Sequence, residues 1–232
     1  MAHASHALDR DMMLPPAEAE TGSGVYTEKL GMWIFLLSEV MFFTALIGSY
    51  LILRVSKPDG WAAPNQILNV PVTAVNTFIL ICSSVTMVKA YAAAADGNQA
   101  KLKLWLVATV LIGATFVGVQ VFEYNQLIHH GLVPGGFVAG RELAEAAASG
   151  AAFKGGPALP TSGGLYGSTF YTMTGFHGFH VTMGVICMIF VTFKAFQGKY
   201  TATDHRGVEV IGLYWHFVDL VWIILFTIVY LI

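Results

Sequence analysis

The sequence contains few charged residues. Of its 232 residues, 11% are Asp, Glu, Lys or Arg and 56% are hydrophobic, whereas charged residues make up about 25% of an average soluble domain. The apolar residues gather in long runs instead of alternating with polar ones, and runs of about 20 residues are long enough to cross the hydrocarbon core of a bilayer. The composition therefore excludes an ordinary soluble domain and predicts an integral membrane protein.

Cysteine and net charge are also scarce. The two cysteines, Cys82 and Cys187, lie in apolar runs without CxxC or other metal-type spacing, which favours small packing residues over a redox or metal pair. The formal net charge of -2 argues against a nucleic-acid partner. Residues 1–27 contain no apolar run, so we interpret them as a polar, flexible N-terminal arm and expect no cleavable signal peptide.

The apolar runs predict five transmembrane helices in one membrane domain, residues 28–232. Because backbone groups in lipid must bond within their own segment, and the short alternating strands of a barrel are missing, the expected fold class is an all-α bundle. No proline interrupts a span, which weakens a carrier interpretation, since many transporters use broken helices. The expected helices are about 30–53, 70–95, 102–128, 165–196 and 208–232.

The distribution of lysine and arginine predicts the orientation. A cytoplasmic N-terminus places eight of these twelve residues inside and four outside, in agreement with the positive-inside rule, and puts the C-terminus in the periplasm. The long loop 129–164 then faces outward and contains a candidate short helix at 141–149. A loop of this length is either functional, for example a partner contact, or without structure of its own.

Acidic residues inside the predicted spans are candidate functional residues, because a charge in the bilayer is costly. Glu39 lies near the middle of the first span, about 14 Å from its start at 1.5 Å per residue, with no lysine or arginine within one turn. It is the best single candidate for a protonatable site, although a neutral acid hydrogen-bonded to a neighbouring helix explains it equally well. Glu123 lies nearer the outer end of the third span.

Two residue pairs with a spacing of three stand in the last two spans. His177 and His180 share one face of the fourth helix, and His216 and Asp219 repeat this spacing on the fifth. Joined across the two helices, they would form a metal set of three histidines and one carboxylate. A haem site, a proton path and structural hydrogen bonding between helices are the alternatives, and spacing alone favours structural pairing.

Four segments carry a resemblance to a known family. Their order and spacing resemble those of subunit III of the haem–copper terminal oxidases, and the likeness extends over all five spans. Larger members of that family have seven helices, and this chain is similar to the shorter bacterial form that lacks the first two. The segments are LGMWIFLLSEVMFF from residue 30, GVQVFEY from 118, GLYGSTFYTMTGFHGFHVTMG from 164 and LYWHFVDLVW from 213.

The resemblance implies an accessory subunit of a respiratory oxidase in the bacterial inner membrane. Such a complex reduces O2 to water and translocates protons. Haem and copper are then held by the partner subunits I and II, with a small subunit IV as a further partner, and this chain binds no metal or redox cofactor. The chain is expected to hold structural phospholipids, stabilise the complex and support proton uptake. Cytochrome c is the favoured electron donor, and quinol is the alternative.

The resemblance also implies roles for the polar residues of the spans. It implies that His177, His180, His216 and Asp219 form the polar interior between the last two helices and do not bind a metal. Glu39 is expected to be a buried protonatable group and a structural anchor.

Further expected roles concern the two ends of the bundle. Glu123 is expected to anchor the third helix near the outer face. Lys194 and Lys199, which close the fourth span, are expected to meet anionic lipid head groups at the inner leaflet. A proton-coupled transporter that uses Glu39 and Asp219 as its relay, and a metal-binding membrane protein, are the rival classes.

Overall fold

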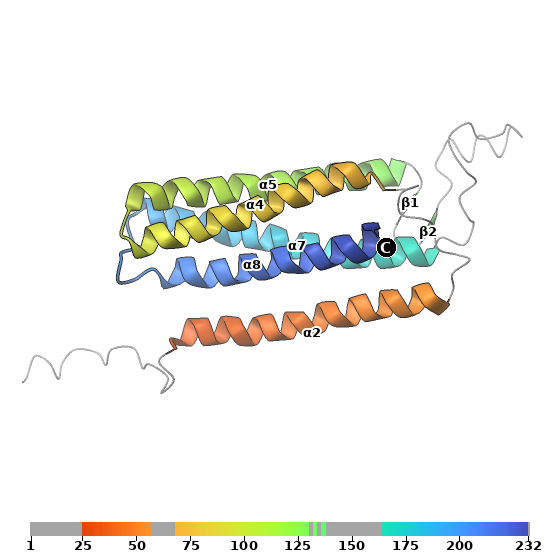
Figure 1. Cartoon of the computed structure of the whole chain (residues 1–232), viewed down its shortest axis with the longest axis horizontal. Coiled ribbons are helices and arrows are strands. Elements are labelled where there is room, and N and C mark those ends of the chain that lie inside the picture. The colour runs from red at the N-terminus through yellow and green to blue at the C-terminus, as the bar shows by residue number, and fades with distance from the viewer. Residues whose placement is uncertain (1–24, 57–67, 130–131, 134–135, 138–163, 232) are drawn as a thin grey trace, which may run out of the picture.

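The computed structural model describes residues 25–56, 68–129, 132–133, 136–137 and 164–231. Five long helices lie lengthwise beside one another (Figure 1). The last of them continues into a π-helical turn, η2 (Thr227–Leu231). The helices are α2 (Thr27–Ser56), α4 (Val70–Ala95), α5 (Gln99–His129), α7 (Gly164–Phe196) and α8 (Arg206–Phe226).

All five helices are long and apolar enough to cross a membrane, which confirms the predicted fold class for the described residues. α4 has the bounds that the sequence predicts. α2 begins at Thr27 instead of Leu30, and α5 begins at Gln99 instead of Leu102. These earlier starts have a simple cause: polar residues can continue a helix beyond the apolar run, into the head-group region.

The long loop holds one feature that the sequence did not predict. Leu132–Val133 (β1) and Gly136–Phe137 (β2) pair antiparallel, with Leu132 opposite Phe137. The candidate helix at 141–149 and residues 1–24 of the polar arm lie outside the described residues.

Two glycine turns make the helices antiparallel neighbours. Gly97 follows the end of α4 and Gly198 follows the end of α7, and both glycines have positive φ, 70° and 71°, a conformation that glycine adopts without steric cost. The side chain of Asn98 then accepts a hydrogen bond from the backbone N–H of Lys101 at the start of α5, as a capping residue does. We call the end of the bundle that holds these turns the turn end, and the opposite end, beside β1 and β2, the hairpin end.

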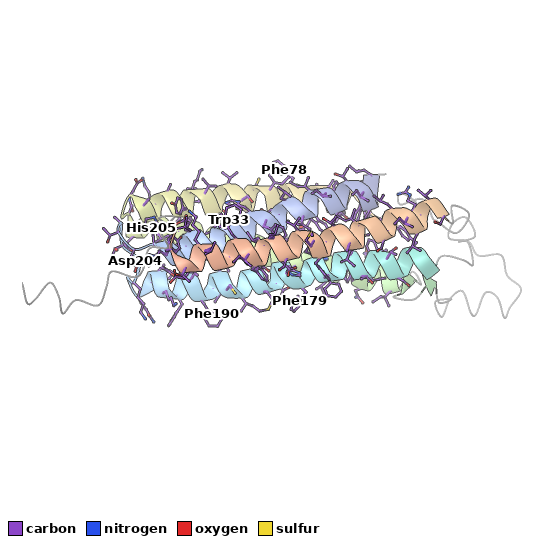
Figure 2. The ribbon with its side chains drawn as sticks, turned by 90° about the horizontal axis from the view of Figure 1, so that it is seen from below. Trp33, Phe78, Phe179, Phe190, Asp204 and His205 are labelled. Atoms are coloured by element: carbon purple, nitrogen blue, oxygen red, sulfur yellow. The ribbon has the colours of Figure 1, made fainter. Side chains whose placement is uncertain are left out.

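Four helices, α4, α5, α7 and α8, form the compact part of the bundle, and α2 packs on its outside along α7 and α8 (Figures 1 and 2). The core contains Phe116, Phe170, Trp215 and Trp222, all buried. The outer surface is also apolar: Phe78 and Phe190 point away from the bundle on opposite sides (Figure 2). An apolar surface of this kind suits contact with lipid tails.

α2 starts at the turn end, and η2 finishes at the hairpin end (Figure 1). The described chain therefore begins and ends at opposite ends of the bundle, as five crossings require.

Gly113 on α5 lies where the core is closely packed, and its substitution tests that packing. A Cβ added there would lie 2.7 Å from Cη2 of Trp215 and 3.0 Å from Cγ2 of Val185. Since Trp215 is completely buried and cannot move aside, Gly113→Ala should destabilise the bundle by about 1–3 kcal/mol. Thermal unfolding in detergent, followed by circular dichroism, measures the change. Gly118→Ala on the same helix, where nothing lies within 4 Å, should be neutral or slightly stabilising; equal effects of the two substitutions would contradict this packing.

Candidate functional site

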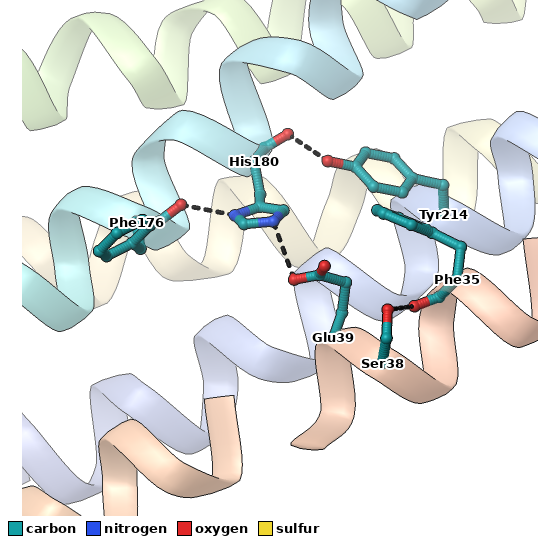
Figure 3. Close-up of polar contacts among 6 residues, drawn as sticks. All are labelled: Phe35, Ser38, Glu39, Phe176, His180 and Tyr214. Atoms are coloured by element: carbon teal, nitrogen blue, oxygen red, sulfur yellow. Dashed lines mark hydrogen bonds and ion pairs between the residues drawn. The ribbon is translucent and has the colours of Figure 1, made fainter. Parts of the chain in front are cut away.

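A polar pair joins the middle of α2 to α7. Oε2 of Glu39 lies 3.1 Å from Nε2 of His180, and the two side chains are 17% and 12% exposed. Nδ1 of His180 lies 2.7 Å from the backbone oxygen of Phe176, and the hydroxyl of Tyr214 on α8 donates to the backbone oxygen of His180. Figure 3 shows the imidazole held from both sides.

These contacts define which ring nitrogen of His180 faces Glu39. The carbonyl of Phe176 can only accept, so Nδ1 of His180 carries a hydrogen. Nε2 then accepts from a protonated Glu39, or donates to an ionised Glu39 if the imidazole is charged. In both forms one hydrogen bond joins Oε2 to Nε2.

Aromatic rings surround this pair. The ring of His180 lies 5.3 Å from that of Phe43 and 5.8 Å from that of Phe179, and Phe42 packs edge-on against Phe176 at 5.1 Å. Such surroundings exclude water and lower the local dielectric constant, which strengthens the interaction between the two polar groups.

His177 belongs to a different environment, although it lies only three residues before His180. It is completely buried, Nε2 lies 3.2 Å from the backbone oxygen of Val218 on α8, and its ring stacks on Trp222 at 4.7 Å. The expected arrangement placed both histidines in one interior between the last two helices. The structure differs because residues three apart still diverge by about 60° around a helix, which is enough to direct His180 to α2 and His177 to the bundle core.

His216 and Asp219 on α8 turn to α4. Ser84 donates a hydrogen bond to Oδ2 of Asp219. The Asp219 residue is buried, with 4% of its surface exposed. Nδ1 of His216 lies 3.1 Å from the same hydroxyl oxygen, and Trp215 donates to the neighbouring Ser83 at 2.9 Å. The sequence reasoning singled out neither serine.

The four polar residues of the last two spans thus contact three different helices. His180 contacts α2, His177 contacts the backbone of α8, and His216 and Asp219 contact α4. They do not converge as the metal set that the spacing allowed. Across the part of the chain that the structure describes, no group of three or more His, Cys, Asp or Glu side chains is placed to hold a metal ion.

Glu123 joins three elements at the hairpin end. Its Oε1 accepts from the hydroxyl of Thr73 on α4 at 2.7 Å and lies 3.4 Å from that of Tyr230 in η2. One turn earlier, Gln120 donates to the backbone oxygen of Thr174 on α7 at 3.0 Å. α5 is therefore linked to α4, α7 and η2 through buried hydrogen bonds.

A cavity of about 750 Å³ opens at the turn end between α2, α7 and α8. Lys194 and Lys199 both line it, together with a third cation, Arg206, and the acids Glu28 and Asp204. Apolar side chains from all three helices form the rest of its wall. A cavity lined by both charged and apolar side chains suits an amphiphile, whose charged head meets the cations and whose chain follows the apolar wall.

Comparison with known proteins gives a consistent result. The chain matches the family described as cytochrome c oxidase subunit III over residues 19–130 and 156–232. It is 36% identical over 203 residues to the probable cytochrome c oxidase subunit 3 of Mycobacterium tuberculosis, a match that covers 88% of this chain and 87% of the relative.

Two further relatives come from other bacteria. The probable cytochrome c oxidase subunit 3 of Nocardia farcinica is 33% identical over 201 residues, which cover 87% of this chain and 86% of the relative. The cytochrome c oxidase subunit 3 of Synechocystis sp. is 36% identical over 202 residues, which cover 87% of this chain and 74% of the relative.

Proposed function

The chain belongs to the cytochrome c oxidase subunit III family, and we propose that it supports a respiratory haem–copper oxidase without carrying a redox centre of its own. Membership makes it one multi-pass membrane subunit of a larger oxidase complex. In our proposal, subunits I and II hold the haems and copper, a small subunit IV is a further partner, and the complex reduces O2 to water while it translocates protons. Cytochrome c is the proposed electron donor, with a quinol oxidase as the alternative.

The observation that carries this proposal is the contact between Glu39 and His180, in which Oε2 lies 3.1 Å from Nε2. An ionisable pair at membrane depth is costly to maintain, so it is a functional candidate by default. It sits where α2 meets α7, and therefore combines the two parts of the proposed role. As a structural anchor it holds α2 in place, and as a protonatable group it supports proton uptake by the complex.

The distribution of cations supports a cytoplasmic turn end in the bacterial inner membrane. Of the eight lysines and arginines among the described residues, only Arg54 lies toward the hairpin end. The positive-inside rule then places the N-terminus in the cytoplasm and the C-terminus in the periplasm. The seven at the turn end are Lys29, Lys89, Lys101, Lys103, Lys194, Lys199 and Arg206.

The cavity at the turn end is the proposed site for a structural phospholipid. Lys194 and Lys199 lie at the end of α7 and just beyond it, and in the proposed orientation they would meet anionic head groups of the inner leaflet. Lysine meets a phosphate as a flexible point charge, so the two residues can share one head group.

Purification of the chain in mild detergent tests its assembly and its donor. The sample should contain copper and show haem bands in a reduced-minus-oxidised spectrum, and both should disappear from the chain once it is stripped from its partners. Turnover with reduced cytochrome c, and not with a quinol, is the expected donor result. A chain that purifies alone, without haem or copper, would contradict the oxidase assignment, and quinol turnover would select the alternative donor.

Substitution of Glu39 tests the role of the Glu39–His180 pair. Glu39→Gln keeps the size of the side chain but cannot ionise, so the complex should assemble with normal haem content. The kinetics of proton uptake, or the number of turnovers before inactivation, should change. Ser38→Ala is the control, because Ser38 is exposed and bonds only locally to the backbone oxygen of Phe35 (Figure 3). Unchanged proton uptake and turnover lifetime in Glu39→Gln would remove Glu39 from the proposal.

Paired lysine substitutions test the lipid site. Lys194→Gln with Lys199→Gln should weaken binding of an anionic lipid by about 30-fold, because each lysine near the surface contributes about 1 kcal/mol. Mass spectrometry of the intact complex counts the bound lipids. Lys101→Gln with Lys103→Gln removes the same charge at the same end, but these residues do not line the cavity. Equal lipid loss in both pairs, or none in the first, would argue against this site.

A further inference from the structure

The level of α2 along the bundle is not fixed by its apolar contacts. Its buried residues are Leu36, Phe43 and Tyr50, which follow one another at intervals of seven and form a single narrow stripe. A slip of α2 by one turn would keep this stripe facing the bundle. In a bilayer the tails of the lipids are as apolar as these side chains, so sliding changes the hydrophobic free energy little.

A cluster of polar contacts holds the start of α2 against the start of α8. Nζ of Lys29 lies 2.5 Å from Oε1 of Glu209, and the hydroxyl of Tyr26 donates to Oε2 of the same carboxylate at 2.6 Å. Both carboxylate oxygens are therefore occupied, by residues one turn apart at the N-terminal end of α2. Charge-assisted hydrogen bonds of this kind are about twice as strong as those between neutral groups. We call these three residues the Glu209 clamp.

Two further observations strengthen the clamp. Burial, followed by the hydrogen bond to Glu209, raises the pKa of the Tyr26 phenol, so this hydroxyl remains a donor at neutral pH. The guanidinium of Arg206, one turn before Glu209 on α8, lies 5.3 Å from the centre of the Tyr26 ring, within range of a cation–π interaction.

The clamp and the Glu39–His180 pair lie on the same helix. Lys29 and Glu39 are separated by ten residues, or about 15 Å of helix. A slip of α2 by a single turn moves each of its residues by about 5.4 Å. That displacement would carry Glu39 out of hydrogen-bond range of His180, which is now 3.1 Å away.

We infer that Glu209 is a positioning residue: through Lys29 and Tyr26 it sets the level of α2 and so brings Glu39 to His180. The inference rests on the proposed role of Glu39 for its functional consequence, but the placement of Glu39 can be measured independently of that role. Glu209 touches neither Glu39 nor His180 and acts through the helix that connects them.

Infrared spectra of the complete oxidase test this inference. The carboxyl band of Glu39 is identified as the band lost in Glu39→Gln, and His180→Phe shows where it falls without its partner. Glu209→Leu should shift the band toward its position in His180→Phe and shorten the turnover lifetime. Asp96→Leu is the matched control, because Asp96 follows α4 at the turn end and belongs neither to the clamp nor to the lining of the cavity, so it should leave the band in place.

A charge exchange separates the clamp from a general loss of stability. Lys29→Glu combined with Glu209→Lys reverses the ion pair and should return the Glu39 band to its original position. If Glu209→Leu fails to assemble, as judged by haem content, Tyr26→Phe removes one of the two bonds and should cause a smaller shift.

Each outcome decides a separate point. An unshifted Glu39 band in Glu209→Leu, or in Tyr26→Phe where that variant replaces it, would overturn the inference. So would a shift that the charge exchange does not reverse. A shifted and reversible band with an unchanged turnover lifetime would confirm the positioning and count against the proposed function of Glu39.

Discussion

Hydrogen bonds between helices give this bundle its specificity. In lipid, apolar surface does not distinguish one helix neighbour from another, whereas a buried polar group without a partner costs several kcal/mol. α8 presents Trp215, Asp219 and Trp222 on one face, and each finds a hydroxyl on α4: Ser83, Ser84 and Thr77 respectively. Any rotation or slip of α8 would break all three bonds together. The register of the two helices is therefore set by polar atoms inside an apolar core.

α2 is packed less closely than the other helices, and the candidate site lies where it meets them. It packs on the outside of the group of four helices (Figure 1), and its polar contacts include those with Glu209 near one end and with His180 near the middle. Regions with fewer buried contacts open at lower free-energy cost than a close-packed core. The Glu39–His180 pair thus lies at the interface between α2 and the other helices, away from the α4–α8 contacts that fix the register of the core.

The sequence predicts the spans well because membrane crossing depends on a one-dimensional property, the length of an apolar run. It predicts the helix ends less well, since residues such as Thr27 and Gln99 extend a helix beyond its apolar part. The sequence alone does not predict which side chains meet across two helices. The spacing of His177 and His180 suggested a common face, but only packing shows that a small angular difference sends them to different helices. Ser84 gave no signal, because a serine in an apolar run looks the same whether it faces lipid or a buried acid.

The geometry of the pair links the docking of α2 to the presence of a proton. Nδ1 of His180 donates to the Phe176 carbonyl, so only Nε2 is available to Glu39. With one proton the pair forms a hydrogen bond, either neutral or ionic, and with two protons the imidazolium still donates to the acid. With none, the lone pair of Nε2 faces the charge of the carboxylate, and the contact becomes repulsive. Without that proton the polar contact in the middle of α2 would be lost, while the contacts of the Glu209 clamp at its start would remain.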